Sequence, residues 1–173
     1  MVAYLKFEEY LNAKSLRSLV DDGVLSWIKY AVVRGEPEED QFLSSLIDEI
    51  GPKGIVSGIG EQPALTHMRK FMLPSFTSGC VCVAPALSMA MLRALEGGDY
   101  PKAKGIREDF RPLENLRNAI HPVTVLHEAL QSSGIAKTGS LLPLLEPVSE
   151  EDRISIKTTA IELMEREEVF AKS

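Results

Sequence analysis

VLSWIKYAVV, residues 24–33, is an almost unbroken apolar run that contains one charged residue, Lys29. Such a run is typical of a strand buried on both faces of a parallel sheet. Three shorter apolar or β-branched runs, at residues 2–5, 54–57 and 76–83, accompany it. Each of the four is followed by a stretch with helical periodicity, at residues 12–20, 37–50, 63–72 and 85–95. This alternation predicts four βα units, a parallel sheet and an α/β fold.

The helix boundaries follow from capping residues. Asn12 is expected to cap the first helix, and Pro37 is expected at the first position of the second, with Glu38, Glu39 and Asp40 in its first turn. No strand pattern appears from residue 100 onward. Helices are predicted there over residues 100–118, 122–133 and 150–171, with an irregular, proline-containing connector at residues 134–149.

Composition limits the partners of the chain. The 173 residues carry 19 Lys and Arg against 25 Asp and Glu, a net charge of −6, so nucleic acid is not an expected partner. The longest apolar run, residues 80–91, is broken by Pro85 and falls short of the roughly 20 residues needed to cross a bilayer, so no membrane partner is expected either. No signal peptide pattern opens the sequence, and the two cysteines, two residues apart, indicate a reducing cytoplasm. The three histidines are scattered without ligand spacing, so no metal site is predicted.

Two residues are candidates for catalysis. Lys29 lies inside an otherwise apolar strand, and burial lowers the pKa of a lysine ammonium, which frees the amine to form a Schiff base with a carbonyl. The alternative is a structural lysine that pairs with a carboxylate or extends to the strand end. If the strand of Tyr4 is the neighbour, its phenol could relay protons at the same end of the sheet. Tyr4 could equally be a core aromatic.

A glycine turn offers a third candidate site. Gly58-Ile59-Gly60 lies between a strand and a helix, where backbone amides can approach a phosphate or carboxylate. Pro63 stands where a dinucleotide fingerprint needs its third glycine, so a simple tight turn is the alternative. An independent α/β domain that binds a phosphorylated ligand at residues 58–61 therefore stays open.

Taken in order, Trp27-Ile28-Lys29, Ile55-Val56-Ser57-Gly58 and the segment from Ser78 to Pro85 resemble the second half of the dihydrodipicolinate synthase and N-acetylneuraminate lyase family. The tail, with Gly98-Asp99, Pro112-Leu113 and Gly134, is similar to the carboxy-terminal helices of that family. The resemblance covers essentially residues 1–145.

This resemblance implies a partial TIM barrel of about four βα units, the family's strands five to eight. Residues 1–97 would form the half-barrel and residues 98–173 a helical extension of the same structural domain. The family comprises class I aldolases and dehydratases that act on 2-oxo acids such as pyruvate and need no cofactor. By resemblance Lys29 is the Schiff-base lysine, Tyr4 the proton shuttle, and Val81 and Gly58 are substrate-binding residues.

The chain also departs from the family. Leu5-Lys6-Phe7 follows Tyr4 where relatives that make dihydrodipicolinate have an asparagine-containing loop and a carboxylate-binding arginine, for which Lys6 or Arg34 could substitute. The family's carboxylate-binding loop of the amino-terminal half has no counterpart, so a truncated or split member is expected. The open sheet edges and exposed inner face would favour a homo-oligomer or a partner that carries the missing half-barrel. The alternative is a catalytically inactive remnant that serves as an interaction or assembly module.

Overall fold

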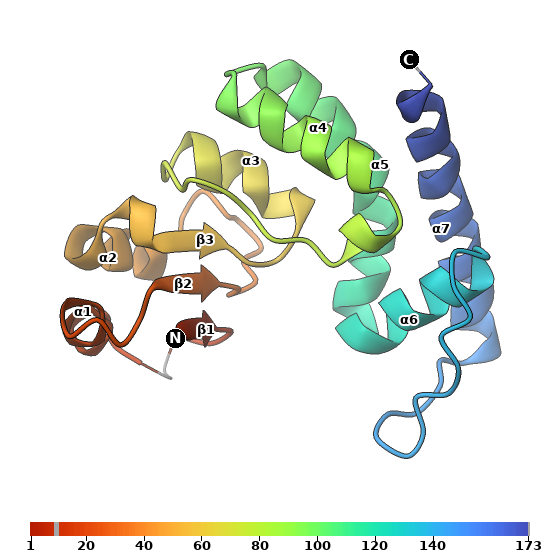
Figure 1. The fold of residues 1–173 in the computed structure, drawn as a ribbon, viewed down its shortest axis with the longest axis horizontal. Helices are drawn as coiled ribbons and strands as arrows, with labels where there is room; N and C mark the ends of the chain where they lie inside the picture. The colour runs from red at the N-terminus through yellow and green to blue at the C-terminus, as the bar shows by residue number, and fades with distance from the viewer. Residues whose placement is uncertain (9–10, 173) are drawn as a thin grey trace. The chain divides into compact units, whose positions relative to one another are not determined.

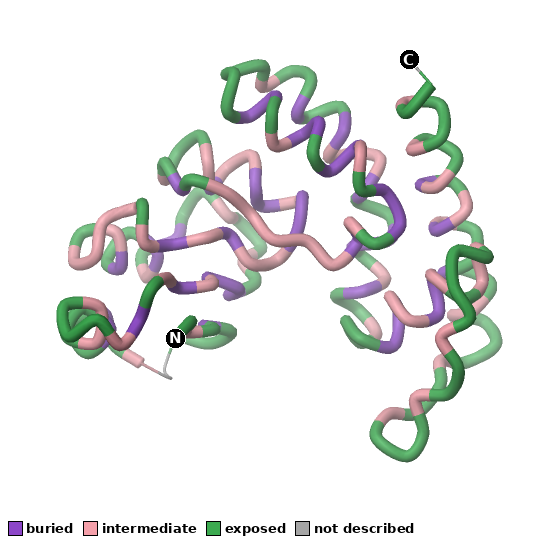
Figure 2. The backbone as a smooth tube through the Cα atoms, viewed as in Figure 1, coloured by how far each residue is buried: buried purple, intermediate pink, exposed green. Residues whose placement is uncertain are grey.

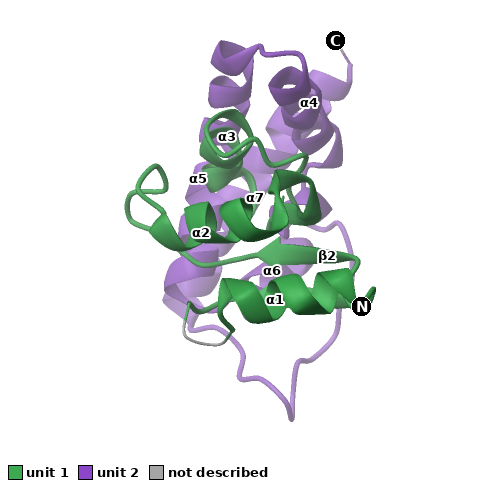
Figure 3. Ribbon diagram, turned by 90° about the vertical axis from the view of Figure 1, so that its left-hand side faces the viewer, with its two compact units in different colours: residues 1–78 green, residues 79–173 purple. Residues whose placement is uncertain are grey.

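The computed structural model describes residues 1–8 and 11–172 and divides into two compact units, residues 1–78 and residues 79–173 (Figure 3). Unit 1 contains the sheet and the helices between its strands, and unit 2 is helical.

Unit 1 is an α/β structure with a parallel sheet, as predicted. In chain order it contains β1 (Val2–Leu5), α1 (Ala13–Asp21), β2 (Trp27–Tyr30), α2 (Gln41–Ile50), the 3-10 turn η1 (Pro52–Gly54), β3 (Ile55–Ser57) and α3 (Glu61–Arg69) (Figure 1). The three strands lie in the order β1-β2-β3 and pair in parallel. In the register Tyr4 lies opposite Lys29, and Lys29 lies opposite Val56.

The core of unit 1 lies on one face of this sheet. Because side chains alternate along a strand, Ile28 and Tyr30 point to the opposite face from Lys29. Ile28 and Tyr30 are fully buried and belong to a cluster that also contains residues of β1, α1, α2 and β3, namely Leu5, Leu16, Leu43, Leu46 and Ile55. On the other face Tyr4 is 56% exposed. Figure 2 shows buried stretches of backbone along the strands of the sheet. The sheet therefore has an apolar face packed against helices and a face that presents Tyr4 and Lys29.

Capping residues set the helix starts of unit 1. The side chain of Asn12 accepts a hydrogen bond of 2.8 Å from Ser15 N and caps α1, which confirms the prediction. The prediction that α2 begins at Pro37 is wrong. Asp40 is the N-cap and accepts a hydrogen bond from Leu43 N at 2.9 Å, so the helix starts at Gln41. The Asp40 carboxylate satisfies an N–H of the first turn that has no partner within the helix, so the helix begins after Asp40.

The strands are shorter than predicted. The predicted strand at residues 24–33 extends only from Trp27 to Tyr30, because the backbone N–H groups of Val24 and Leu25 bond instead to Leu19 O at the end of α1. The fourth strand, predicted over residues 76–83, is wrong among the described residues: only Phe76 makes a bridge, to Ser57. Cys80–Cys82 form the 3-10 turn η2, whose Val83 N bonds to Cys80 O at 3.0 Å. These local turn bonds use the backbone groups that a strand would need for its neighbour.

Unit 2 matches the predicted helices within one residue at each end. It contains η2, α4 (Pro85–Glu96), α5 (Tyr100–Ala119), α6 (Pro122–Ser132) and α7 (Glu150–Ala171), with residues 133–149 free of helix and strand. α7 packs on α4, α5 and α6. Its Glu167 accepts hydrogen bonds from Ala86 N at 2.7 Å and Leu87 N at 2.8 Å, and so caps α4, which has no local side-chain cap. No helix in the described residues is both long and apolar enough to cross a bilayer.

Candidate functional site

Lys29 and Tyr4 form a pair on the open face of the sheet. They occupy paired positions of neighbouring parallel strands, each one residue before the carboxyl end of its strand. The Nζ atom of Lys29 lies 5.3 Å from the centroid of the Tyr4 ring, a cation–π distance. The condition on which the sequence-based role of Tyr4 depended is therefore met: β1 and β2 are neighbours, and both residues lie at the same end of the sheet.

Gly58 packs against the stem of Lys29. Its N–H donates a hydrogen bond of 2.6 Å to Tyr30 O, which continues the β2–β3 pairing beyond the strand end. A Cβ atom at position 58 would lie 2.7 Å from Tyr30 O and 2.8 Å from Lys29 Cγ. Only glycine fits this approach, so the backbone of Gly58 and the ring of Tyr4 border the same lysine side chain.

Val81, the fourth residue singled out from the sequence, lies in η2 of unit 2 and is half-buried. Val81 thus belongs to a different unit from Lys29, Tyr4 and Gly58. Cys80 is buried in the same turn and Cys82 is exposed. Lys29, Tyr4 and Gly58 are thus the predicted site residues that one unit brings together.

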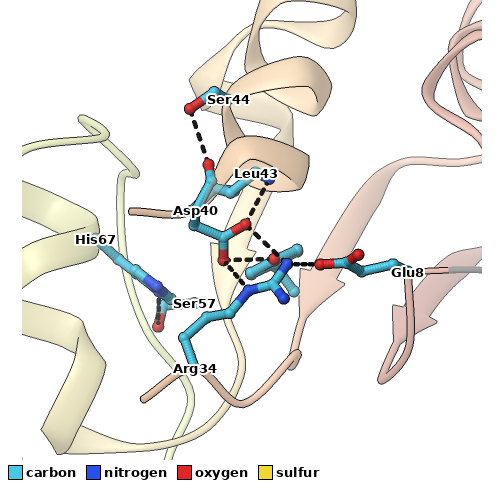
Figure 4. A network of polar contacts seen from close by, with 8 residues as sticks. Glu8, Arg34, Asp40, Leu43, Ser44, Ser57 and His67 are labelled. Carbon is cyan, nitrogen blue, oxygen red and sulfur yellow. Dashed lines mark hydrogen bonds and ion pairs between the residues drawn. The ribbon is translucent and has the colours of Figure 1, made fainter. Parts of the chain in front are cut away.

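A buried carboxylate network includes Tyr30, the residue after Lys29, and was not anticipated from the sequence. Asp40, 2% exposed, accepts hydrogen bonds from Tyr30 Oη at 2.6 Å, Arg34 Nε at 3.0 Å, Arg34 Nη2 at 3.1 Å and Leu43 N at 2.9 Å (Figure 4). Burial by itself would raise the pKa of the Asp40 carboxyl, but the hydrogen bonds from Arg34, Tyr30 and Leu43 outweigh it and hold the pKa below its usual value. Asp40 is therefore an anion at neutral pH.

Arg34 was one of two candidates for binding a substrate carboxylate. Its guanidinium pairs with Asp40 and also with Glu8, so two carboxylates of the chain already neutralise it. The other candidate, Lys6, borders an open cavity of about 510 Å³ that Phe7, Glu8, Val32 and Val33 also line. The two candidates therefore differ in their surroundings. Arg34 is held in ion pairs within the chain, whereas Lys6 lines an open cavity.

His67 and Ser57 form a second buried polar contact in unit 1. The Nδ1 atom of His67, 1% exposed, lies 2.8 Å from Ser57 Oγ (Figure 4). Burial lowers the pKa of His67 to about 4, so the imidazole is neutral at pH 7. No group of three or more metal-ligating side chains occurs in the part of the chain that the structure describes. The sequence signal was weak here, because a single histidine on a helix reveals nothing about the strand residue it will contact.

The fold and the candidate site define an α/β protein in which Lys29 and Tyr4 lie near the carboxyl ends of neighbouring parallel strands. Dihydrodipicolinate synthase from Oceanobacillus iheyensis is similar with 27% sequence identity and a TM-score of 0.75, over 91% of this chain and 52% of that one. The enzyme from Bacillus clausii is similar with 23% identity and a TM-score of 0.76, over 91% and 53%. The 4-hydroxy-tetrahydrodipicolinate synthase of Methylacidiphilum fumariolicum SolV has 18% identity and a TM-score of 0.75, over 92% and 51%.

This chain therefore has the fold of a part of the dihydrodipicolinate synthases and spans about half of their length. That finding supports the family resemblance seen in the sequence. No protein-family model matches the sequence, and no curated protein does.

Proposed function

We propose that this chain carries the Schiff-base half of a lyase active site that acts on a 2-oxo acid such as pyruvate or a 2-oxo-3-deoxy sugar acid. The observation that carries the proposal is the Lys29–Tyr4 pair, with Nζ 5.3 Å from the ring centroid on paired positions of β1 and β2. An amine beside a phenol, near the carboxyl ends of parallel strands, is a suitable arrangement for imine chemistry.

The reaction begins with the neutral amine of Lys29. Its nitrogen attacks the ketone carbon of the 2-oxo acid, and the ketone oxygen takes a proton to give a carbinolamine. Loss of that hydroxyl as water leaves a protonated imine on Lys29. The imine accepts the electron pair released when a neighbouring carbon–carbon bond breaks, or when the adjacent carbon loses a proton to give an enamine, which then expels a hydroxyl group that leaves as water. Tyr4 delivers and removes the protons, and the imine needs no further cofactor.

Gly58 and Val81 are proposed to contact the substrate. Gly58 contributes a bare backbone beside the Lys29 stem, where a Cβ atom would collide. The proposal for Val81 rests on the family resemblance of the segment from Ser78 to Pro85. The carboxylate of the 2-oxo acid needs donors of its own, because catalysis depends on a substrate held in place beside the amine.

We further propose that unit 1 is part of a TIM barrel, with β1, β2 and β3 as the family's strands five to seven. Its remaining strands would come from other residues of a longer chain or from a partner that carries the other half-barrel, in a cytoplasmic homo-oligomer or complex. The solved dihydrodipicolinate synthases, about twice as long as this chain, support the proposal. The assignment of residues 1–97 to the half-barrel and residues 98–173 to a helical extension of one structural domain stays a prediction.

The test is reductive trapping. The protein is incubated with pyruvate or a 2-oxo-3-deoxy sugar acid, reduced with borohydride, and digested for peptide mass spectrometry. An adduct on Lys29 is expected, and it should be absent from Lys29→Met and present in the matched control Lys14→Met, whose lysine is exposed on α1. An adduct spread over several surface lysines, or retained in Lys29→Met, would refute the assignment.

Replacing Tyr4 with Phe separates binding from proton transfer. The ring stays beside Lys29, while the phenolic hydroxyl is lost, so adduct formation should slow by about 100-fold, as removal of a general acid–base group does. Tyr100→Phe, on α5 of unit 2, is the control. An unchanged rate in Tyr4→Phe would remove Tyr4 from the mechanism. If folded wild-type protein forms no adduct, the alternative of an inactive half-barrel that acts as an assembly module is favoured.

A further inference from the structure

Asp40 is the centre of a buried polar cluster in unit 1. Its carboxylate receives one hydrogen bond from β2 (Tyr30), two from the segment after β2 (Arg34) and one from the first turn of α2 (Leu43). The two bonds from Arg34 use both carboxylate oxygens, which makes the pair bidentate. A cluster of this kind fixes the relative positions of three segments more firmly than apolar packing alone.

The first connection of the Asp40 cluster is its hydrogen bond to Tyr30 of β2. Tyr30 follows Lys29, and successive side chains of a strand point to opposite faces of the sheet. The Tyr30 ring is fully buried, with centroids 6.1 Å from Phe42 and 5.9 Å from His67, and its hydroxyl is bonded to Asp40. Anchoring the phenol on the packed face therefore sets the rotation of β2 about its own axis, and with it the direction of the Lys29 side chain.

The second connection of the cluster runs through Arg34 and joins the segments that follow β1 and β2. Arg34 comes five residues after Lys29, and Glu8 comes four residues after Tyr4. The Arg34 guanidinium bonds to Asp40 on one side and to Glu8 on the other (Figure 4). The backbone continues this connection, since Ala31 N donates to Leu5 O at 2.7 Å. The segments that follow β1 and β2 are therefore bonded to each other and to the start of α2.

We propose that Asp40 and Arg34 are positioning residues that hold Lys29 against the Tyr4 ring by fixing β2 and the segments after β1 and β2. Neither residue touches the substrate in this proposal. It rests on the proposed function, because positioning matters for the reaction only if Lys29 is the reacting amine. A displacement of about 1 Å at a reacting group can lower a rate about 100-fold, so a network behind the strand can control the rate without contacting the substrate.

The first test uses a signal that does not depend on activity. Reductive methylation with ¹³C-formaldehyde makes each lysine visible by NMR and keeps its charge. The Lys29 resonance is assigned by its loss in Lys29→Arg, and its ring-current shift is calibrated with Tyr4→Leu. In Asp40→Asn the Lys29 resonance should move toward the unshifted position of Tyr4→Leu. In the control Asp48→Asn, the same substitution at an exposed site of α2, it should not move.

The second test measures the rate of borohydride-trapped adduct formation against pyruvate concentration, per folded molecule. Asp40→Asn and Arg34→Lys should lower the maximal rate at least about tenfold and change the half-saturating pyruvate concentration less than about twofold. Arg34→Lys keeps the charge but loses the bidentate geometry, so it should not restore the rate. A purely structural role would lower only the folded fraction and leave both parameters at wild-type values.

The outcomes distinguish the two proposals. A wild-type Lys29 resonance in both Asp40→Asn and Arg34→Lys overturns the positioning role, whatever the activity. A shift that depends on Asp40 in a protein that forms no adduct supports the positioning of Lys29 and refutes the reaction. If Asp40→Asn does not fold, Arg34→Lys and Tyr30→Phe replace it. Each of these changes removes the hydrogen bonds of one partner of Asp40 and leaves the carboxylate with its other donors.

Discussion

The buried imidazole of His67 makes the stability of unit 1 depend on pH. Burial lowers the pKa of His67 from its ordinary value of 6.5 to about 4 in the folded protein. Between these two values the unfolded chain binds a proton that the folded chain does not. Unfolding is then favoured as the pH falls, so the stability contributed by neutral His67 is complete above pH 6.5 and is lost progressively toward pH 4.

The magnitude follows from the two pKa values. A difference between 6.5 and about 4 corresponds to about 3 kcal/mol of unfolding free energy lost between pH 7 and pH 4. This is a large fraction of the roughly 5–15 kcal/mol that stabilises a typical domain. Asp40, whose pKa lies below its usual value, adds to the loss at still lower pH, with the same sign.

The assay is urea unfolding at a series of pH values, followed by the fluorescence of Trp27, the only tryptophan of the chain, which lies in β2 of unit 1. Wild type and His67→Gln are compared by their pH dependence, so that a general destabilisation of the variant cancels. The free energy of unfolding of wild type should fall by about 3 kcal/mol more than that of His67→Gln between pH 7 and pH 4. The control His127→Gln, on α6 of unit 2, should follow wild type. Parallel curves for wild type and His67→Gln would refute the argument that burial of His67 carries this pH dependence.

Two further substitutions test local packing and capping. Gly58→Ala places a Cβ atom 2.7 Å from a backbone oxygen that cannot move away, so it should lower the unfolding free energy by about 1–3 kcal/mol in the same fluorescence assay. Gly35→Ala, which meets no atom within 4 Å, should change it by less than about 1 kcal/mol, and equal effects of the two would contradict the close approach. Glu167→Ala removes both hydrogen bonds to the first turn of α4 and should lower the stability of unit 2 by about 1–2 kcal/mol in thermal melting followed by circular dichroism. Glu168→Ala removes only an exposed ion pair with Lys172, and a loss as large as that of Glu167→Ala would show that the cap contributes nothing specific.

The helical half of the chain was largely predictable from the sequence because its signals are local. α7 begins and ends at the predicted residues, and α4, α5 and α6 differ by one residue at most. Proline at the first helical position and apolar periodicity act within one or two turns, so no distant residue is needed to read them. The start of α2, by contrast, was misplaced. Its capping residue Asp40 is also bonded to Tyr30 and Arg34, which only the folded chain brings to it.

The strands were predicted less accurately than the helices, because strand pairing depends on residues distant in the sequence. Residues 76–83 have the composition of a strand, yet Cys80–Cys82 form a 3-10 turn and only Phe76 bridges to Ser57. β-propensity measures how well a side chain packs on a half-buried pleated surface, and the neighbours that provide that surface are distant in the sequence. The same holds for the site: Lys29 was noticeable as a charge in an apolar run, while the carboxylate network of Asp40 left no pattern to find.

The sequence by itself determined the α/β alternation, the helices after residue 100 and the family resemblance, because these depend on periodicity and order along the chain. Only the tertiary structure decided that Tyr4 lies beside Lys29 at a cation–π distance, that Gly58 closes on the lysine stem, and that Arg34 is held by Asp40 and Glu8. The contacts of Lys29 with Tyr4 and Gly58 and of Arg34 with Glu8 join residues 25 to 29 positions apart, and Asp40 lies 6 positions after Arg34. They exist only once strand pairing and helix packing have chosen which side chains meet.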